Sequence, residues 1–203
     1  MIQIIPDGYI IKQEHKNSQE VVMENNKRIP IRIITVTAVF TAMNIVMSSF
    51  SVPVPGGHLY LNDVVIAVAS MLLGPLPAFV VGGVGAFLGD LFFYPAPMFV
   101  SLVTHGLQAV AISIISHKFR KENLLLGSDE DPIFWKSILA VFVGAVIMVV
   151  GYSFGRAYIY GNPEQALLKL PYQILQAFVG GFLGIILVFV VDLKGIYRKI
   201  FKF

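Results

Sequence analysis

Polar and ionisable side chains interrupt the long apolar stretches of this sequence, and three of them could do proton or metal chemistry. Asp63, Asp90 and His105 lie inside or at the ends of apolar segments. One imidazole with two carboxylates could bind a metal ion or act as a general acid and base. The His-x-x-Glu spacing of metal-binding helices is absent, and no hydroxyl nucleophile is clearly paired with a base. The residue types therefore favour ligand binding, with an intramembrane enzyme or a ligand-free assembly subunit as alternatives.

Amides and tyrosines accompany these titratable residues at helical spacing. Ser101, His105 and Gln108 follow one another at four and three residues, which places them on one helix face. Gln173 and Gln176 form a second polar stripe beside a tyrosine. Two such stripes with further tyrosines are typical of a site for a small polar molecule, including an aromatic one. The candidate substrate-binding residues are therefore Asn44, Asn62, Asp63, Asp90, Tyr94, His105, Gln108, Tyr152, Tyr172, Gln173 and Gln176.

Structural roles stay open for several of these residues. Asn62 and Asp63 could cap the start of a helix instead of binding a ligand. Asp90 could form a structural ion pair with Arg156. His105 could be a hydrogen-bonded core residue, because buried polar groups usually find partners.

Composition indicates which elements must position these residues. The 203 residues are 56% hydrophobic and 13% charged, with a mean hydropathy of +0.76 and no cysteine. Soluble domains are about 25% charged, so an ordinary soluble enzyme and a disordered chain are both excluded. The lack of cysteine excludes disulfides, thiolate metal sites and a cysteine nucleophile. Because a span needs about 20 mostly apolar residues, we predict an all-α polytopic membrane protein with six transmembrane helices, at about 31–50, 61–73, 77–93, 97–116, 134–158 and 165–191.

Basic residues predict the orientation of these helices. Clusters within 27–32, 118–136 and 194–202 fall on one side of a six-helix arrangement, whereas the other side holds only Arg156 and Lys169. The positive-inside rule therefore places both termini in the cytoplasm. Cytoplasmic ends beside anionic lipid account for the net charge of +3 without a nucleic-acid partner. Residues 1–28 form a polar cytoplasmic segment in which Met23 is an alternative start, and residues 29–203 form the six-helix substrate-binding domain.

In this orientation nearly every polar residue inside a span lies in the outer half of the membrane. A channel would need polar lining throughout, and a symmetric carrier would hold its site at the midplane, often between inverted repeats. The pattern instead predicts an outward-facing polar cup on an apolar base. Outside the membrane, residues 52–60 join the first two spans, and Gly56, Gly57 and His58 could form either a hinged lid over the cup or a plain connector.

An ordered set of short runs resembles one family. The runs are Pro53-Val54-Pro55-Gly56-Gly57, Leu61-Asn62-Asp63, Leu72-Leu73-Gly74-Pro75, Gly82-Gly83-Val84-Gly85, Gly89-Asp90 and Pro171-Tyr172-Gln173-Ile174-Leu175-Gln176-Ala177. With the six spans and the Ala38-x-x-x-Ala42 pair, they cover about residues 32–192. The chain resembles the substrate-binding S component of energy-coupling factor (ECF) vitamin transporters, most closely the branch for pyridoxine and hydroxymethylpyrimidine.

The resemblance implies a multi-pass protein of the cell membrane that binds a vitamin or its precursor from outside. It implies docking to a membrane-embedded coupling protein through Ala38 and Ala42, and two cytoplasmic ATPases whose ATP hydrolysis topples the S component inward. We expect no cofactor in this chain, which lacks a glycine-rich phosphate loop ending in Lys-Ser/Thr.

The residue types of the cup bear on the ligand. A neutral pyridine or pyrimidine alcohol suits Asp, His, Gln and Tyr partners, whereas a carboxylate ligand would require Arg156 or Lys169 in the cup. Because we expect those two cations at the rim, we predict pyridoxine or hydroxymethylpyrimidine, with pantothenate or riboflavin as alternatives.

Overall fold

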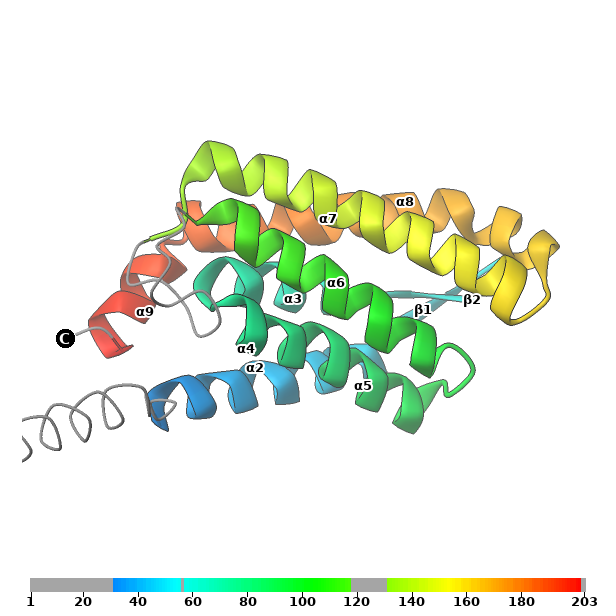
Figure 1. The fold of residues 1–203 in the computed structure, drawn as a ribbon, viewed down its shortest axis with the longest axis horizontal. Coiled ribbons are helices and arrows are strands. Elements are labelled where there is room, and N and C mark those ends of the chain that lie inside the picture. Colours follow the sequence, from blue (N-terminus) through cyan, green and yellow to red (C-terminus); the bar gives the residue numbers. More distant parts are fainter. Residues whose placement is uncertain (1–30, 56, 118–130, 202–203) are drawn as a thin grey trace, which may run out of the picture. The chain divides into compact units, whose positions relative to one another are not determined.

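The chain folds into a helical bundle with one small hairpin (Figure 1). The computed structural model describes residues 31–55, 57–117 and 131–201. The elements in chain order are α2 (Ile31–Ser49), β1 (Ser51–Val54), β2 (Gly57–Tyr60), α3 (Asn62–Leu72), α4 (Pro75–Phe79), η1 (Val80–Val84), α5 (Gly85–Phe93), α6 (Met98–Ser116), α7 (Phe134–Phe154), η3 (Gly155–Ile159), α8 (Pro163–Ile185), η4 (Ile186–Val190) and α9 (Leu193–Phe201), where η marks a π-helical turn.

Five helical segments of the described residues are long and apolar enough to cross a membrane: Ile31–Ser49, Pro75–Phe93, Met98–Ser116, Phe134–Ile159 and Pro163–Val190. They match five of the six predicted spans to within a few residues. The remaining one, at 61–73, is the apolar helix α3 of 11 residues. Such a helix rises about 16 Å, whereas the hydrocarbon core of a bilayer is about 30 Å thick. The all-α prediction is confirmed apart from the hairpin, and α3 is shorter than a full span.

The segment at 52–60 is more ordered than the loop expected from the sequence. β1 and β2 pair antiparallel, with Pro53 opposite His58 and Val54 opposite Gly57. Proline lacks a backbone donor and is tolerated on an edge strand, which β1 is. These strands are not predictable from the sequence, because two prolines and two glycines in seven residues are typical of a loop.

Helix α3 lies in the middle of the bundle. It packs against α2, α6 and α8, and most of its side chains from Asn62 to Met71 are buried. By contrast, α2 packs against α5, α3 and η1 and leaves most of its surface uncovered. Ala67, Met71, Ile112 and Val188 form part of an apolar core cluster that joins α3, α6 and η4.

Close backbone contact fixes α6 against the helix that contains η1. A Cβ atom at Gly82 would lie 2.6 Å from the carbonyl oxygen of His105 and 2.7 Å from the Cβ of Ala109. Only glycine allows the two helices to approach this closely without a shift of the backbone. This contact positions the part of α6 that carries His105.

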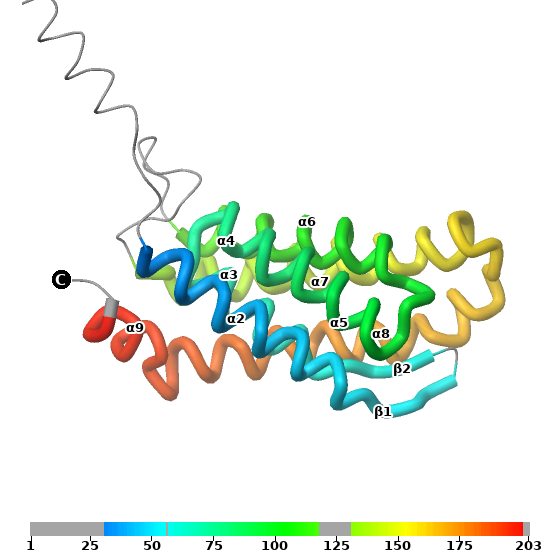
Figure 2. Tube along the Cα trace, turned by 90° about the horizontal axis from the view of Figure 1, so that it is seen from below, coloured from blue at the N-terminus to red at the C-terminus, as the bar shows by residue number. Residues whose placement is uncertain are grey.

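The two ends of the described chain lie at the same end of the bundle. Figures 1 and 2 show the start of α2 beside α9 at one end and the β1–β2 hairpin towards the other. Helix α3 runs back from the hairpin to the end at which α4 begins, so it reverses the chain direction as a complete span would.

Candidate functional site

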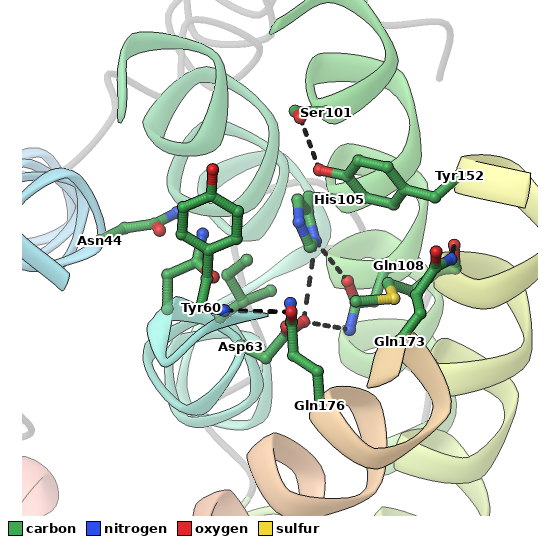
Figure 3. Close-up of polar contacts among 12 residues, drawn as sticks. Asn44, Tyr60, Asp63, Ser101, His105, Gln108, Tyr152, Gln173 and Gln176 are labelled. Carbon is green, nitrogen blue, oxygen red and sulfur yellow. Dashed lines mark hydrogen bonds and ion pairs between the residues drawn. The ribbon is translucent and has the colours of Figure 1, made fainter. Parts of the chain in front are cut away.

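Asp63 is the centre of a buried hydrogen-bond network that joins three helices (Figure 3). Its Oδ1 accepts a hydrogen bond of 3.1 Å from Nε2 of Gln108 on α6, and its Oδ2 accepts one of 2.5 Å from Nε2 of Gln176 on α8. Nδ1 of His105 lies 3.7 Å from Oδ1. Asp63 itself is 1% exposed, so these donors replace the water that a carboxylate otherwise needs.

The amides of this network have defined orientations. Because Gln108 donates to Asp63 through Nε2, its Oε1 is left to accept from Nδ1 of His105, at 2.7 Å. Gln176 likewise donates to Asp63 and accepts from the backbone N–H of Tyr60, at 3.0 Å. Asp63 therefore orients His105 through the amide of Gln108, and it orients the end of strand β2 through the amide of Gln176.

Neither Asn62 nor Asp63 caps α3, which was one alternative from the sequence. The capping position is Leu61, and no side chain bonds to the free amides there. The hydrogen bonds of Asp63 go instead to residues of α6 and α8.

A second cluster surrounds Asp90 at the end of α5. The hydroxyl of Ser101 donates to Oδ2 of Asp90, so it can only accept from the hydroxyl of Tyr152. The ring of Tyr152 meets the imidazole of His105 edge to face, with centroids 5.2 Å apart. In the described residues no ion pair within 4.0 Å joins Asp90 to Arg156, so Asp90 does not form the structural pair that the sequence left open.

A polar pocket opens directly beside these clusters. Its free space, including the open mouth, is about 310 Å³. Four of the candidate residues line it, namely Tyr94, Tyr152, Gln173 and Gln176. Asp63, Asp90, His105 and Gln108 form a layer behind that wall, and each connects through hydrogen bonds to a residue that lines the pocket.

Five further residues line the pocket and were not among the candidates: Tyr60, Pro97, Met148, Arg156 and Lys169. The two cations were expected at the rim. Instead, Lys169 is 4% exposed, and Nη1 of Arg156 donates to Oε1 of Gln173 at 3.0 Å inside the pocket wall. Arg156 and Lys169 lie one helical turn from other polar candidates, and this spacing was the signal in the sequence that could have found them. How deeply a side chain is buried in the bundle depends on helix packing, which the sequence does not reveal.

Three further candidate residues lie neither in the pocket wall nor in the layer behind it. Asn44 is fully buried and donates to the carbonyl oxygen of Val81 in η1, at 2.5 Å. Asn62 donates to the hydroxyl of Ser48 on α2, at 3.4 Å, so both asparagines connect helices. Tyr172 is half-buried on α8 and has no place in the pocket lining.

Most of the described bundle, up to the start of α9, matches a known family. A family model described as "ECF-type riboflavin transporter, S component" matches residues 28–193. The chain belongs to the S components of ECF transporters. This S component is 32% identical over 177 residues to the thiamine precursor transporter HmpT of Lactococcus lactis, which covers 83% of this chain and 95% of HmpT.

Two other relatives carry no assigned substrate in their names. An uncharacterized protein of Pyrococcus woesei is 31% identical over 142 residues, which is 67% of this chain and 87% of that protein. The UPF0397 protein YdcD of Lactococcus lactis is 24% identical over 144 residues, or 70% and 76% of the two chains. The S component is thus a multi-pass membrane transport protein and not an enzyme.

In this S component the hairpin lies against the pocket. Gly57 has a φ of 148°, and a Cβ there would lie 3.3 Å from Nζ of Lys169. The imidazole of His58 meets the ring of Tyr94 at 4.9 Å. Two of the three candidate lid residues therefore contact the pocket wall, while Gly56 lies outside the described residues.

Tyr60 closes the hairpin side of the pocket. Its hydroxyl oxygen is buried and has no hydrogen-bond partner in the described residues. Burial raises the pKa of the Tyr60 phenol well above its usual value, and the nearby Asp90 carboxylate raises it further. Tyr60 therefore presents a neutral hydroxyl donor to the pocket.

The candidate docking pair of the S component lies on a separate surface. Ala38 and Ala42 are one helical turn apart and exposed on α2. Large apolar side chains on the same helix are exposed as well, among them Ile34, Val39 and Val46.

Proposed function

We propose that this S component binds a small single-ring heterocycle of the hydroxymethylpyrimidine or pyridoxine type from outside the cell and delivers it inward. The observation that carries the proposal is the pocket of tyrosine rings and oriented amides over the Asp63 network. Rings stack on the tyrosines, and amides hydrogen-bond to ring nitrogens and hydroxyl groups.

One finding favours a single ring over a flavin. The name of HmpT, which the chain matches over most of both lengths, gives a thiamine precursor as the substrate of that relative. Riboflavin is the second candidate ligand, because the matching family model is named for a riboflavin transporter.

The proposal includes a six-pass topology with the pocket outside and both termini in the cytoplasm. Helix α3 with the hairpin at its outer end then forms the second pass, because it reverses the chain direction within the bundle. The basic residues of α9 support a cytoplasmic C-terminus by the positive-inside rule.

Single cysteines test this topology, since the chain has none of its own. Glu164→Cys and Lys199→Cys occupy exposed positions after α7 and in α9. A membrane-impermeant maleimide should label Glu164→Cys in intact cells and Lys199→Cys only in opened ones. Labelling of both in intact cells would refute the six-pass topology.

Transport requires partners that drive the movement. We propose that a membrane-embedded coupling protein docks on α2 at Ala38 and Ala42, where small side chains allow close helix approach. Two cytoplasmic ATPases would hydrolyse ATP and tilt the S component until its pocket opens inside. A pocket that faces the outside needs such a movement of the whole body to release its ligand into the cell.

A ligand screen on the purified chain tests the binding function. A ligand at about 100 times its Kd adds roughly 2.7 kcal/mol to apparent stability, which thermal unfolding detects. Pyridoxine or hydroxymethylpyrimidine should stabilise the protein. Stabilisation by riboflavin alone would refute the single-ring proposal and favour riboflavin as the ligand. Tyr94→Ala, in the pocket wall, should remove the effect, whereas the matched variant Tyr172→Ala should retain it. If both variants respond alike, ligand binds elsewhere.

A further inference from the structure

The pocket wall carries charge of one sign. Arg156 and Lys169 are the two charged residues among those that line it. Lys169 is 4% exposed, so its ammonium group has lost most of its water. Burying a cation is costly unless an anion or several acceptors compensate for the lost hydration.

Neither cation has a carboxylate partner among the described residues. The contacts within 4.0 Å between a basic side chain and a carboxylate there join His105 to Asp63 and Arg198 to Asp131. Asp63 accepts from two glutamine amides and Asp90 from Ser101, so both nearby carboxylates are bound by neutral donors behind the wall. The negative charge therefore lies in the deeper layer and the positive charge lies at the pocket surface.

Aromatic rings hold the two cations without neutralising them. Nζ of Lys169 lies 5.6 Å from the ring centroid of Tyr60, and the guanidinium of Arg156 lies 5.6 Å from that of Tyr152. Arg156 uses one of its five N–H groups on Gln173, and no hydrogen bond to Nζ of Lys169 occurs in the described part of the chain. With the unpartnered hydroxyl of Tyr60, the pocket thus presents several free donors at one place.

We propose that the ligand carries an anionic group, a carboxylate or a phosphate, which binds between Lys169, Arg156 and the hydroxyl of Tyr60. This inference rests on the proposed function and narrows its substrate class to charged heterocycles. It also reverses the expectation of a neutral ligand, because that expectation depended on both cations lying outside the pocket. A carboxylate or phosphate would supply the counter-charge and the acceptors that the pocket lacks.

Matched ligand pairs test the proposal. Titration calorimetry of the purified full chain would compare pyridoxine with pyridoxine 5′-phosphate, hydroxymethylpyrimidine with its phosphate, and pyridoxal with 4-pyridoxic acid. The first two pairs report on phosphate and the third on carboxylate. We expect the anionic member of at least one pair to bind ten times more tightly or better. Equal or tighter binding of the neutral member in every pair would overturn the proposal.

Variants that remove the charge of Lys169 or Arg156 test whether these two cations cause the preference for anionic ligands. Lys169→Gln and Arg156→Gln should each reduce the preference for the anionic member by tenfold or more, measured as the ratio of the two Kd values within each pair. Lys194→Gln in α9, outside the pocket, is the matched control and should keep the preference. An equal loss for both members of a pair would contradict the proposal, and either pocket variant suffices if the other does not fold.

A further experiment distinguishes a wrong ring type from the absence of an anion site. If no member of any pair binds, inorganic phosphate is tested directly against chloride at equal ionic strength. Thermal stabilisation by phosphate that Lys169→Gln abolishes would support the anion site with a ligand of another ring type. No stabilisation, or stabilisation that persists in Lys169→Gln, would overturn it.

Discussion

Replacing Asp63 with asparagine isolates the role of the buried carboxylate. The side chain keeps its shape, but one of its two acceptor oxygens becomes a donor that faces the amide of Gln108 or Gln176. Neither glutamine can turn its amide without losing a second bond, to His105 or to the backbone of Tyr60. The variant therefore loses one hydrogen bond to a charged acceptor, which costs about 1.5–3 kcal/mol.

Thermal unfolding of the detergent-purified protein measures this cost. For chains of about 150–250 residues, 1 kcal/mol corresponds to a Tm shift of about 2–4 °C, so Asp63→Asn should lower Tm by about 3–12 °C. Asp131→Asn is the matched control, because its ion pair with Arg198 is partly exposed, with side chains 31% and 55% accessible. Exposed pairs contribute about 0–1 kcal/mol. A Tm for Asp63→Asn no lower than that of the control would refute the structural role of the network.

Three further changes test other parts of the structure. Ala38→Trp combined with Ala42→Trp should leave ligand affinity intact and abolish uptake by cells that express the complete transporter, and unchanged uptake would contradict docking at this pair. His105→Ala should weaken ligand binding at least tenfold, about 1.4 kcal/mol, because its ring supports Tyr152 in the pocket wall; an unchanged Kd in a folded variant would leave His105 a core residue. Gly82→Ala should destabilise the protein by about 1–3 kcal/mol in thermal unfolding, since its Cβ would meet the backbone carbonyl of His105; an unchanged Tm would contradict this close approach.

Helical periodicity predicted the parts of the site that lie on one helix. His105 and Gln108 were placed on one face from a spacing of three residues, and their side chains are hydrogen-bonded. Gln173 and Gln176 were paired in the same way, and both line the pocket. Apolar length likewise predicted five of the spans, because that signal is local to each segment.

Helical periodicity does not predict which residues of different helices contact one another. Because burying an unpaired amide is costly, we expect Asn44 to have a hydrogen-bond partner. Which partner it has could not be predicted: it is the carbonyl oxygen of Val81 in the π-helical turn η1. Arg156 and Lys169 lie near helix ends in the sequence, but the hairpin over the pocket encloses Lys169. Such outcomes depend on how elements pack, and a single sequence carries little information about that.

The shortness of α3 has an electrostatic consequence for the site. The aligned peptide dipoles of a helix place roughly half a positive charge at its N-terminus. A helix that crossed the whole bilayer would leave this charge in water, whereas α3 starts within the bundle, at Asn62 and Asp63, both of which are buried. The partial positive charge of its N-terminal amides therefore lies inside the protein, beside the buried side chain of Asp63. The dipole of this short, buried helix is thus part of the electrostatic environment of Asp63, together with the amides of Gln108 and Gln176.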